Sequence, residues 1–233
     1  MKNKVLLFGA SGNLGKGLKH ILNKQKITHI TPSREQCDIT DFDKVYSFIN
    51  TTQPNIIIHS AGYVDTEGCE QNKQLCLDNN VLGTFNIVKV GRSNNIRLIY
   101  ISSEYVFPGN CFDTYTPHSI PNPKNTYGIS KTCSEFLVKT LNNYLVIRAP
   151  FIRDNIFPYE YAFIDQHTSR QYICQITEDI INASLSDNIG IKHIVGEYQS
   201  VYDLAKLTNP KVKSIKTPDN LKKILPLNLN LVE

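Results

Sequence analysis

The sequence predicts an α/β fold, a doubly wound parallel β-sheet covered by helices on both faces. Short runs rich in Val, Ile and Leu alternate along the chain with stretches of helical periodicity. The run at residues 56–59, Ile-Ile-Ile-His, does not alternate with polar residues, as expected for a parallel strand buried on both faces. A glycine-rich turn separates the first apolar run from the first helical stretch. This β-α-β-α order implies a parallel sheet.

The elements follow in order as far as residue 150. Strands are predicted at the apolar runs 5–8, 27–31, 56–59, 98–102 and 145–147. Helices are predicted where apolar residues recur at helical spacing, at 15–23, 42–50, 75–92 and 127–141. Asp41 is a suitable N-cap for the second helix, and Asn94 and Asn95 separate the third helix from the next strand. The connections between parallel strands are expected to be right-handed crossovers.

After Pro150 the pattern is weaker. It predicts two short helices, at 178–185 and 201–207, and one strand at 191–195. The proline-containing segment 117–123 is predicted to be a loop. We therefore divide the chain into a main domain, residues 1–150, and a small C-terminal part, residues 151–233.

Composition excludes several classes of protein. The chain has 233 residues and a net charge of +4 without a run of Lys or Arg, which argues against nucleic-acid binding and is compatible with an anionic small molecule. No apolar run is long enough to span a bilayer, and the first is too short for a signal peptide, so we expect a cytoplasmic protein without a membrane partner. The six cysteines form neither a CxxC pair nor a Cys/His cluster, which predicts free thiols and no metal site.

Three glycines mark the turn after the first strand. Gly9, Gly12 and Gly15 form a GxxGxxG pattern, related to the fingerprint of dinucleotide-binding proteins. Gly9 permits a tight turn, Gly12 lets the backbone approach a pyrophosphate, and Gly15 lets helix and strand pack closely. The sequence therefore predicts a Rossmann-type fold with a dinucleotide site; the alternative is an ordinary tight turn.

The residues after the second strand bear on the choice of cofactor. NAD-binding proteins usually place an acidic residue there, but this chain has Ser33 and Arg34. Arg34 can pair with a 2′-phosphate and Ser33 can add a hydrogen bond, which favours NADP. The alternative is a solvated surface arginine. Asp38 lies where the next short strand is expected, which would bring it near the adenine. The alternative is that Asp38 caps a loop.

A catalytic pattern is present in the second half of the main domain. Tyr127 and Lys131 are four residues apart, on one face of a helix, where the ammonium is expected to lower the pKa of the phenol. Ser103 follows a strand, where open α/β sheets bind ligands. The three side chains predict a Ser-Tyr-Lys catalytic set; the alternative is a surface tyrosine beside a solvated lysine.

With these motifs the chain resembles the extended short-chain dehydrogenases/reductases, and within them the dTDP-4-dehydrorhamnose reductases. The matching segments are 9–15, 53–62, 80–84, 101–109, 125–131 with Glu135, 146–150, 165–166 and 196–197. Three features depart from the family pattern. Ser103 stands where the family usually has Thr, Glu104 stands where it has Asp, and the region after Phe151 is shorter.

The resemblance implies NADPH-dependent reduction of the C4 ketone of a nucleotide-activated 4-keto-6-deoxyhexose, of the dTDP- or UDP-4-dehydrorhamnose type, in deoxysugar biosynthesis. Tyr127 would donate the proton, Ser103 would hold the ketone oxygen, and Lys131 would tune Tyr127 and hold the nicotinamide ribose. Residues 1–150 would bind NADP and residues 151–233 would form a reduced substrate-binding region. The implied cofactor residues are Gly9, Ser11, Gly12, Asn13, Leu14, Gly15, Ser33, Arg34, Asp38, Ile39, Ser60, Ala61, Gly62, Lys131 and Pro150. The implied substrate residues are Tyr63, Glu104, Arg153 and Arg170.

Several alternatives stay open. A non-catalytic NADP-binding regulatory subunit, like that of methionine adenosyltransferase, resembles the same motifs. A bifunctional epimerase/reductase would need a cysteine near the catalytic serine, and Cys111 is in a different register. Tyr63 could have a packing role only. Arg153 and Arg170 could be charged surface residues without a role in binding. The apolar faces of helices 75–92 and 127–141 suit a homodimer or simply cover the sheet.

Overall fold

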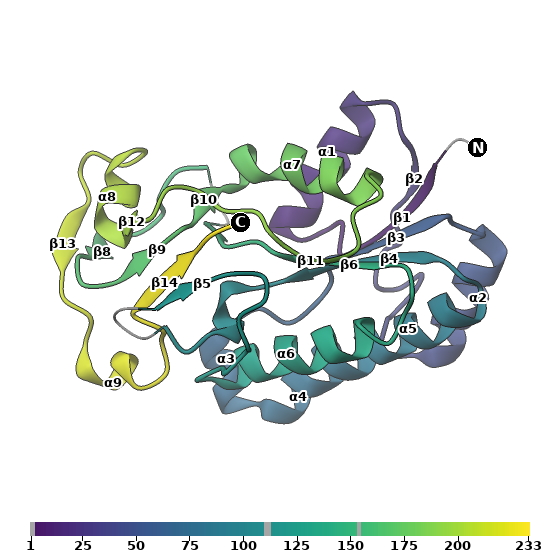
Figure 1. The fold of residues 1–233 in the computed structure, drawn as a ribbon, viewed down its shortest axis with the longest axis horizontal. Helices are drawn as coiled ribbons and strands as arrows, with labels where there is room; N and C mark the ends of the chain where they lie inside the picture. Colours follow the sequence, from purple (N-terminus) through teal and green to yellow (C-terminus); the bar gives the residue numbers. More distant parts are fainter. Residues whose placement is uncertain (1–2, 110–112, 153–154) are drawn as a thin grey trace.

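The main sheet has six parallel strands in the order β11-β6-β4-β3-β1-β2. Figure 1 shows it in the computed structural model, which describes residues 3–109, 113–152 and 155–233. In that order the strands are Gly190–His193, Tyr144–Arg148, Arg97–Ser102, Ile56–His59, Lys4–Phe8 and Thr28–Ile30. From β1 the chain moves outward to β2, then returns to the other side of β1 for β3. The switch point of this doubly wound sheet therefore lies between β1 and β3, where such folds bind ligands.

Helices cover both faces of the sheet (Figure 1). Helices α1 (Asn13–Lys24) and α7 (Ile173–Leu185) lie on one face, and α2 (Phe42–Thr52), α5 (Gly83–Ser93) and α6 (Thr126–Val138) lie on the other. Alternate residues of one strand enter different cores: Val5 and Leu7 pack in the core with α1 and α7, and Leu6 packs in the opposite core. Burial of both faces explains why the strands are continuously apolar.

Two predictions for the helices have different outcomes. Asp41 caps α2 as predicted, since its Oδ1 accepts a hydrogen bond of 3.1 Å from Lys44 N. The single helix predicted at 75–92 consists instead of α4 (Lys73–Leu77), a π-helical turn η1 (Asp78–Leu82) and α5. At η1, the hydroxyls of Thr84 (2.6 Å) and Ser134 (2.9 Å) donate to the carbonyl oxygen of Asn80. These side-chain bonds stabilise the irregular turn.

Among the described residues are short strands that the sequence pattern does not reveal, and all but Thr114–Tyr115 lie in the C-terminal part. Three small sheets have the orders β12-β9-β14-β5, β10-β7 and β13-β8. Their strands, in chain order, are Thr114–Tyr115, Phe151–Ile152, Tyr161–Phe163, His167–Thr168, Gln171–Tyr172, Gln199–Ser200, Lys213–Ile215 and Asn228–Leu231. The remaining helices are α3 (Thr66–Gln71), α8 (Val201–Lys206) and α9 (Asp219–Lys222). Strands of two to four residues are too short to show a periodicity.

The two parts of the chain are structurally continuous. Helix α7 and strand β11 follow residue 150, yet β11 pairs with β6 at the edge of the main sheet and α7 packs beside α1. The predicted boundary at residue 150 therefore does not coincide with a boundary of the sheet. In the ranges that the structure describes, no helix is both long and apolar enough to cross a membrane.

Candidate active site

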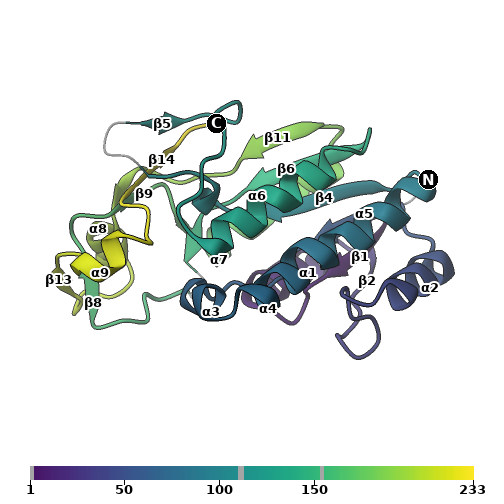
Figure 2. The ribbon, with the colours of Figure 1, turned by 90° about the horizontal axis from the view of Figure 1, so that it is seen from below.

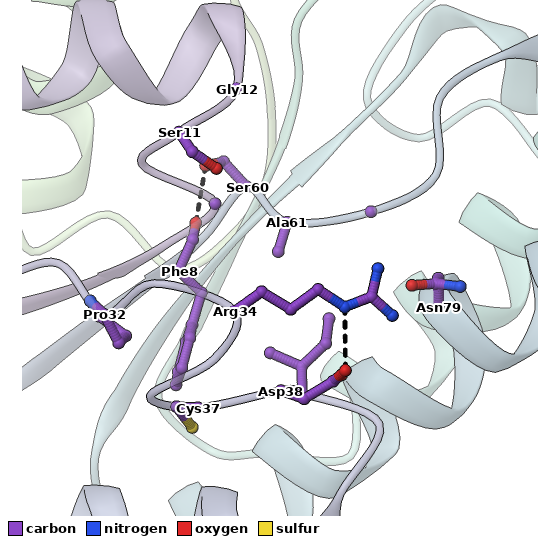
Figure 3. Close-up of a pocket in the computed structure, with 13 residues that line it drawn as sticks. Phe8, Ser11, Gly12, Pro32, Arg34, Cys37, Asp38, Ser60, Ala61 and Asn79 are labelled. Carbon is purple, nitrogen blue, oxygen red and sulfur yellow. Dashed lines mark hydrogen bonds and ion pairs between the residues drawn. The ribbon is translucent and has the colours of Figure 1, made fainter.

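A cavity of about 220 Å³ opens at the switch point of the sheet (Figure 3). It is bounded by the segments that follow β1, β2 and β3, and by η1. The lining consists of Phe8, Gly9, Ser11, Gly12, Pro32, Arg34, Cys37, Asp38, Ile39, Ser60, Ala61, Gly62 and Asn79. Most of these are residues for which the sequence predicts cofactor binding. The sequence analysis did not predict four of the lining residues, which are Phe8, Pro32, Cys37 and Asn79. For Asn79 a signal was present in the sequence, because this residue directly precedes the matching segment 80–84.

Close backbone contacts require glycine at two positions of the turn after β1. Gly9 has a φ of +86°, and a Cβ there would lie 2.5 Å from Ala61 N. A Cβ on Gly15 would lie 2.0 Å from Gly9 O. Gly12 is the exposed N-cap of α1 and lines the cavity. The N-cap of this helix therefore lies at the cavity, and helix N-termini are suited to binding an anion.

Arg34 and Asp38 form an ion pair at the cavity wall. Arg34 Nε donates to Asp38 Oδ2 over 2.9 Å, and Figure 3 shows the guanidinium extending between Asp38 and Asn79. Burial would raise the pKa of Asp38, but hydrogen bonds from Thr40 and Arg34 outweigh it and hold that pKa below its usual value. The short strand predicted at Asp38 is wrong. Asp38 Oδ1 instead accepts bonds from Thr40 N (3.0 Å) and Oγ1 (2.9 Å), which fold the segment into a turn.

The other residues predicted to bind the cofactor lie outside the cavity lining. Leu14 is in the core, whereas Asn13 is exposed at the start of α1. The Ser33 hydroxyl accepts a 3.3 Å bond from Gln36 N. Pro150 is buried after β6 and accepts a 3.3 Å bond from Gln171 N.

The structure brings Ser103, Tyr127 and Lys131 together at the carboxyl edge of the sheet. Ser103 follows β4 and caps the 3₁₀ turn η2 (Glu104–Val106), and its hydroxyl lies near enough to the Tyr127 hydroxyl to lower the pKa of that phenol. Lys131 Nζ donates to the carbonyl oxygen of Ile101 over 2.6 Å and lies 4.2 Å from the centre of the Tyr100 ring. All strands of this sheet are parallel, so the set shares the sheet edge with the cavity.

The electrostatics differ from the prediction for Tyr127. Burial raises the pKa of Tyr127 above its usual value, against the hydrogen bond to Ser103, which lowers it. Burial lowers the pKa of Lys131 to about 7, although Glu135 raises it. The prediction that Lys131 lowers the pKa of Tyr127 is not met, because the amine is directed to Ile101 and Tyr100. Tyr127 therefore keeps its proton at neutral pH.

The first turn of α6, which carries Tyr127, is held by two side chains. Asn125 Oδ1 accepts a 2.7 Å bond from Gly128 N. Glu70, from α3, accepts bonds from Thr126 N (2.6 Å) and Thr126 Oγ1 (3.0 Å). A carboxylate at this position also complements the helix dipole. Sequence reasoning missed Glu70, because it lies 56 residues before the backbone that it caps.

The candidate substrate residues have specific partners. Asn80 fixes Tyr63 by accepting from its N–H (2.6 Å) and donating to its carbonyl (3.0 Å), while the Tyr63 hydroxyl packs against Gly68. Glu104 is buried and paired with Arg170, so its carboxylate does not face open space. Arg153 and Cys111 lie outside the described residues. Among those described, no group of three or more His, Cys, Asp or Glu side chains could hold a metal ion.

A doubly wound sheet with a glycine turn, a switch-point cavity and a strand-end Ser-Tyr-Lys set defines an extended short-chain dehydrogenase/reductase fold. Comparison with known families gives the narrower assignment. The family described as the RmlD substrate binding domain matches residues 2–163, and the chain belongs to this family.

Known relatives agree with this assignment. A dTDP-4-dehydrorhamnose reductase of Aggregatibacter actinomycetemcomitans is 30% identical over 140 residues, 60% of this chain and 48% of that protein. A methionine adenosyltransferase 2 subunit beta of Rattus norvegicus is 31% identical over 159 residues, 64% of this chain and 47% of that protein. The chain thus spans about half the length of the curated relatives it matches. The structure of dTDP-4-dehydrorhamnose reductase from Bacillus anthracis in complex with NADP is 27% identical, with a TM-score of 0.84, covering 93% of this chain and 85% of that one.

Proposed function

We propose that this protein reduces the C4 ketone of a nucleotide-activated 4-keto-6-deoxyhexose with NADPH. The observation that carries the proposal is the position of Ser103 near the Tyr127 hydroxyl, with buried Lys131 on the same helix, at the same sheet edge as the switch-point cavity. Family membership supports it, and so do the relatives named as reductases of dTDP-linked keto-sugars.

The cavity fits NADP. Gly9 and Gly15 allow backbone approaches that a Cβ would block, and Gly12 presents the start of α1 to a pyrophosphate. Arg34 contacts Asp38 through Nε, and its outer nitrogens extend past the carboxylate toward Asn79 (Figure 3). A guanidinium held in this way can pair with a 2′-phosphate through those nitrogens. The relative from Bacillus anthracis was crystallised with NADP.

The catalytic side chains fit reduction of a ketone. When bound, the reduced nicotinamide supplies a hydride to the carbonyl carbon. Tyr127 Oη, which is protonated at neutral pH, donates its proton to the ketone oxygen. Ser103 Oγ orients this hydroxyl and the oxygen that receives the proton. We assign the binding of the sugar nucleotide to the small sheets of residues 151–233, with Tyr63 and Arg170 at the border of the site.

A nicotinamide absorbance assay tests this proposal. NADPH would be incubated with the protein and a panel of 4-keto-6-deoxy sugar nucleotides, generated in place by a dehydratase and an epimerase. We expect NADPH consumption that depends on both sugar and protein. NADPH binding without turnover on any sugar of the panel would refute the proposal.

The methionine adenosyltransferase relatives favour one second candidate, a non-catalytic NADP-binding regulatory subunit. Retention of Ser103, Tyr127 and Lys131 does not distinguish the two functions, because a binding-only relative can keep them. A stoichiometric complex with a methionine adenosyltransferase catalytic subunit, together with tight NADPH binding and no turnover, would identify the regulator.

Arg34→Ala is expected to weaken NADPH binding about 10- to 150-fold and to leave NADH binding nearly unchanged. The reason is the loss of charge-assisted hydrogen bonds to the 2′-phosphate, each worth ~1.5–3 kcal/mol. Titration calorimetry with both cofactors measures the effect, with Arg92→Ala, an exposed arginine on α5, as control. Equal weakening of both cofactors would show that Arg34 does not select NADPH.

We further propose that the protein is a homodimer joined through α5 and α6, which lie side by side in Figure 2. Both helices expose large apolar side chains, among them Phe85 (45% exposed) and Phe136 (60%). Light scattering should give twice the chain mass of 26.4 kDa for the wild type. For Phe136→Asp it should give the mass of one chain. Ile189→Asp, which alters an exposed loop residue, is the control. A monomeric wild type would exclude the dimer.

A further inference from the structure

A buried ion pair lies directly behind the catalytic set. Glu104 follows Ser103 in the chain and is only 2% exposed. Its Oε1 accepts from Arg170 Nε over 2.5 Å, and its Oε2 accepts from Thr168 Oγ1 over 2.9 Å. Both oxygens of this carboxylate are thus used by one short segment of the C-terminal part. The pair fixes that segment against the end of β4.

Arg170 extends this network to the catalytic tyrosine. Its Nη2 donates to Tyr105 Oη over 3.2 Å, and its guanidinium lies 5.6 Å from the centre of the Tyr105 ring. The Tyr105 ring meets the Tyr127 ring edge to face, with 6.0 Å between their centres. Contacts therefore run without a gap from Glu104 through Arg170 and Tyr105 to Tyr127.

The backbone around Arg170 is firmly held. The strands on either side of it pair with others, β9 with β14 and β10 with β7. Ser169 O accepts a 2.8 Å bond from Gly196 N, and a Cβ on Gly196 would lie 3.0 Å from Arg170 O. The backbone contacts and the ion pair with Glu104 together restrict the movement of Arg170. The guanidinium acts as a fixed point for the phenol.

We propose that Arg170, oriented by Glu104, is a positioning residue that holds the Tyr127 phenol in place through Tyr105. A buried ion pair adds little net stability when compared with apolar residues of similar volume, so its contribution here is geometric. Proton transfer needs the donor oxygen within hydrogen-bond reach of the acceptor, and small displacements are costly. The C-terminal part thereby becomes part of the catalytic apparatus.

The consequence for turnover rests on the proposed reductase function. Arg170→Gln is expected to lower kcat about 10- to 100-fold, the size of effect that a misplaced catalytic group produces, with less than ~3-fold change in KM for NADPH. Tyr105→Phe, which keeps the ring and removes the acceptor oxygen, should lower kcat by a smaller factor. In the double variant the two effects should not add, because both residues act along one path. Lys222→Gln breaks an exposed ion pair with Asp219 on α9, outside the small sheets, and is the control.

A second measurement does not depend on activity. In protein labelled with ¹³C at the tyrosine ζ-carbon, the Tyr127 signal is assigned by its loss in Tyr127→Phe. We expect this signal to move in Arg170→Gln and in Tyr105→Phe, and to stay in place in Lys222→Gln. Tyr105→Phe keeps the test valid if Arg170→Gln does not fold. An unmoved Tyr127 signal, or additive kcat effects in an active enzyme, would overturn the proposal. Absence of turnover in the wild type with a moved signal would count against the reductase function alone.

Discussion

Replacing Tyr127 with Phe should lower kcat about 10²–10⁴-fold, the contribution typical of general acid catalysis. The substitution removes the hydroxyl that we propose as the proton donor and whose pKa the Ser103 side chain lowers. It keeps the ring, and with it the edge-to-face contact with Tyr105. The fold and the switch-point cavity should therefore be preserved, and NADPH should bind as it does to the wild type. Steady-state NADPH oxidation and calorimetric binding measure the two quantities separately.

Tyr46→Phe provides the control for this substitution. It removes the same hydroxyl from a half-exposed tyrosine on α2, away from Ser103 and Lys131, and should leave kcat unchanged. If Tyr127→Phe kept a rate near that of the wild type, Tyr127 would not be the proton donor. The proposed mechanism would then need another acid at this sheet edge.

The parts of this site that the sequence predicted depend on local spacing. The turn from Gly9 to Gly15 is contained in seven consecutive residues, and Tyr127 and Lys131 share a face because a helix repeats every 3.6 residues. The parallel direction of the strands in the main sheet, with helices on both faces, followed from the alternation of elements. These features need no knowledge of which distant residues meet.

The parts that the sequence did not predict depend on long-range contacts. Glu70 caps a helix 56 residues away, and Arg170 pairs with Glu104 across 66 residues. The electrostatic role of Lys131 was also misjudged, because its direction is set by Ile101 O and the Tyr100 ring, neither of which a spacing rule identifies. The π-helical turn at Asn80 results from hydroxyls on two other positions, Thr84 and Ser134.

Glu135→Ala should destabilise the fold by about 3–5 kcal/mol, a large part of the ~5–15 kcal/mol that stabilises a typical domain. Glu135 and Arg148 are 3% and 1% exposed and form two hydrogen bonds, from Arg148 Nε (2.9 Å) and Nη2 (2.8 Å). Ser102 Oγ donates to the same carboxylate over 2.5 Å. Removing the carboxylate leaves the buried guanidinium without its counter-charge. Urea unfolding measures the loss of free energy.

Two further variants separate the buried charge from the loss of packing. Glu160→Ala breaks an ion pair whose side chains are both 63% exposed, and should cost less than about 1 kcal/mol. Replacing Glu135 and Arg148 together with Leu and Met should recover much of the stability, because no charge is then left unpaired. A Glu135→Ala protein within ~1 kcal/mol of the wild type would mean that water or another group compensates Arg148.

The same carboxylate connects the stability of the fold to the chemistry of the site. Glu135 lies one helical turn after Lys131 and raises the pKa of its amine, against burial, which holds it at about 7. Without Glu135 that pKa should fall further, and Lys131 would be mostly neutral at neutral pH. Ser102, which donates to Glu135, directly precedes Ser103. The Ser102–Glu135 hydrogen bond thus joins the end of β4 to the helix that carries Tyr127, so loss of Glu135 should displace Ser103 relative to Tyr127 even in molecules that remain folded.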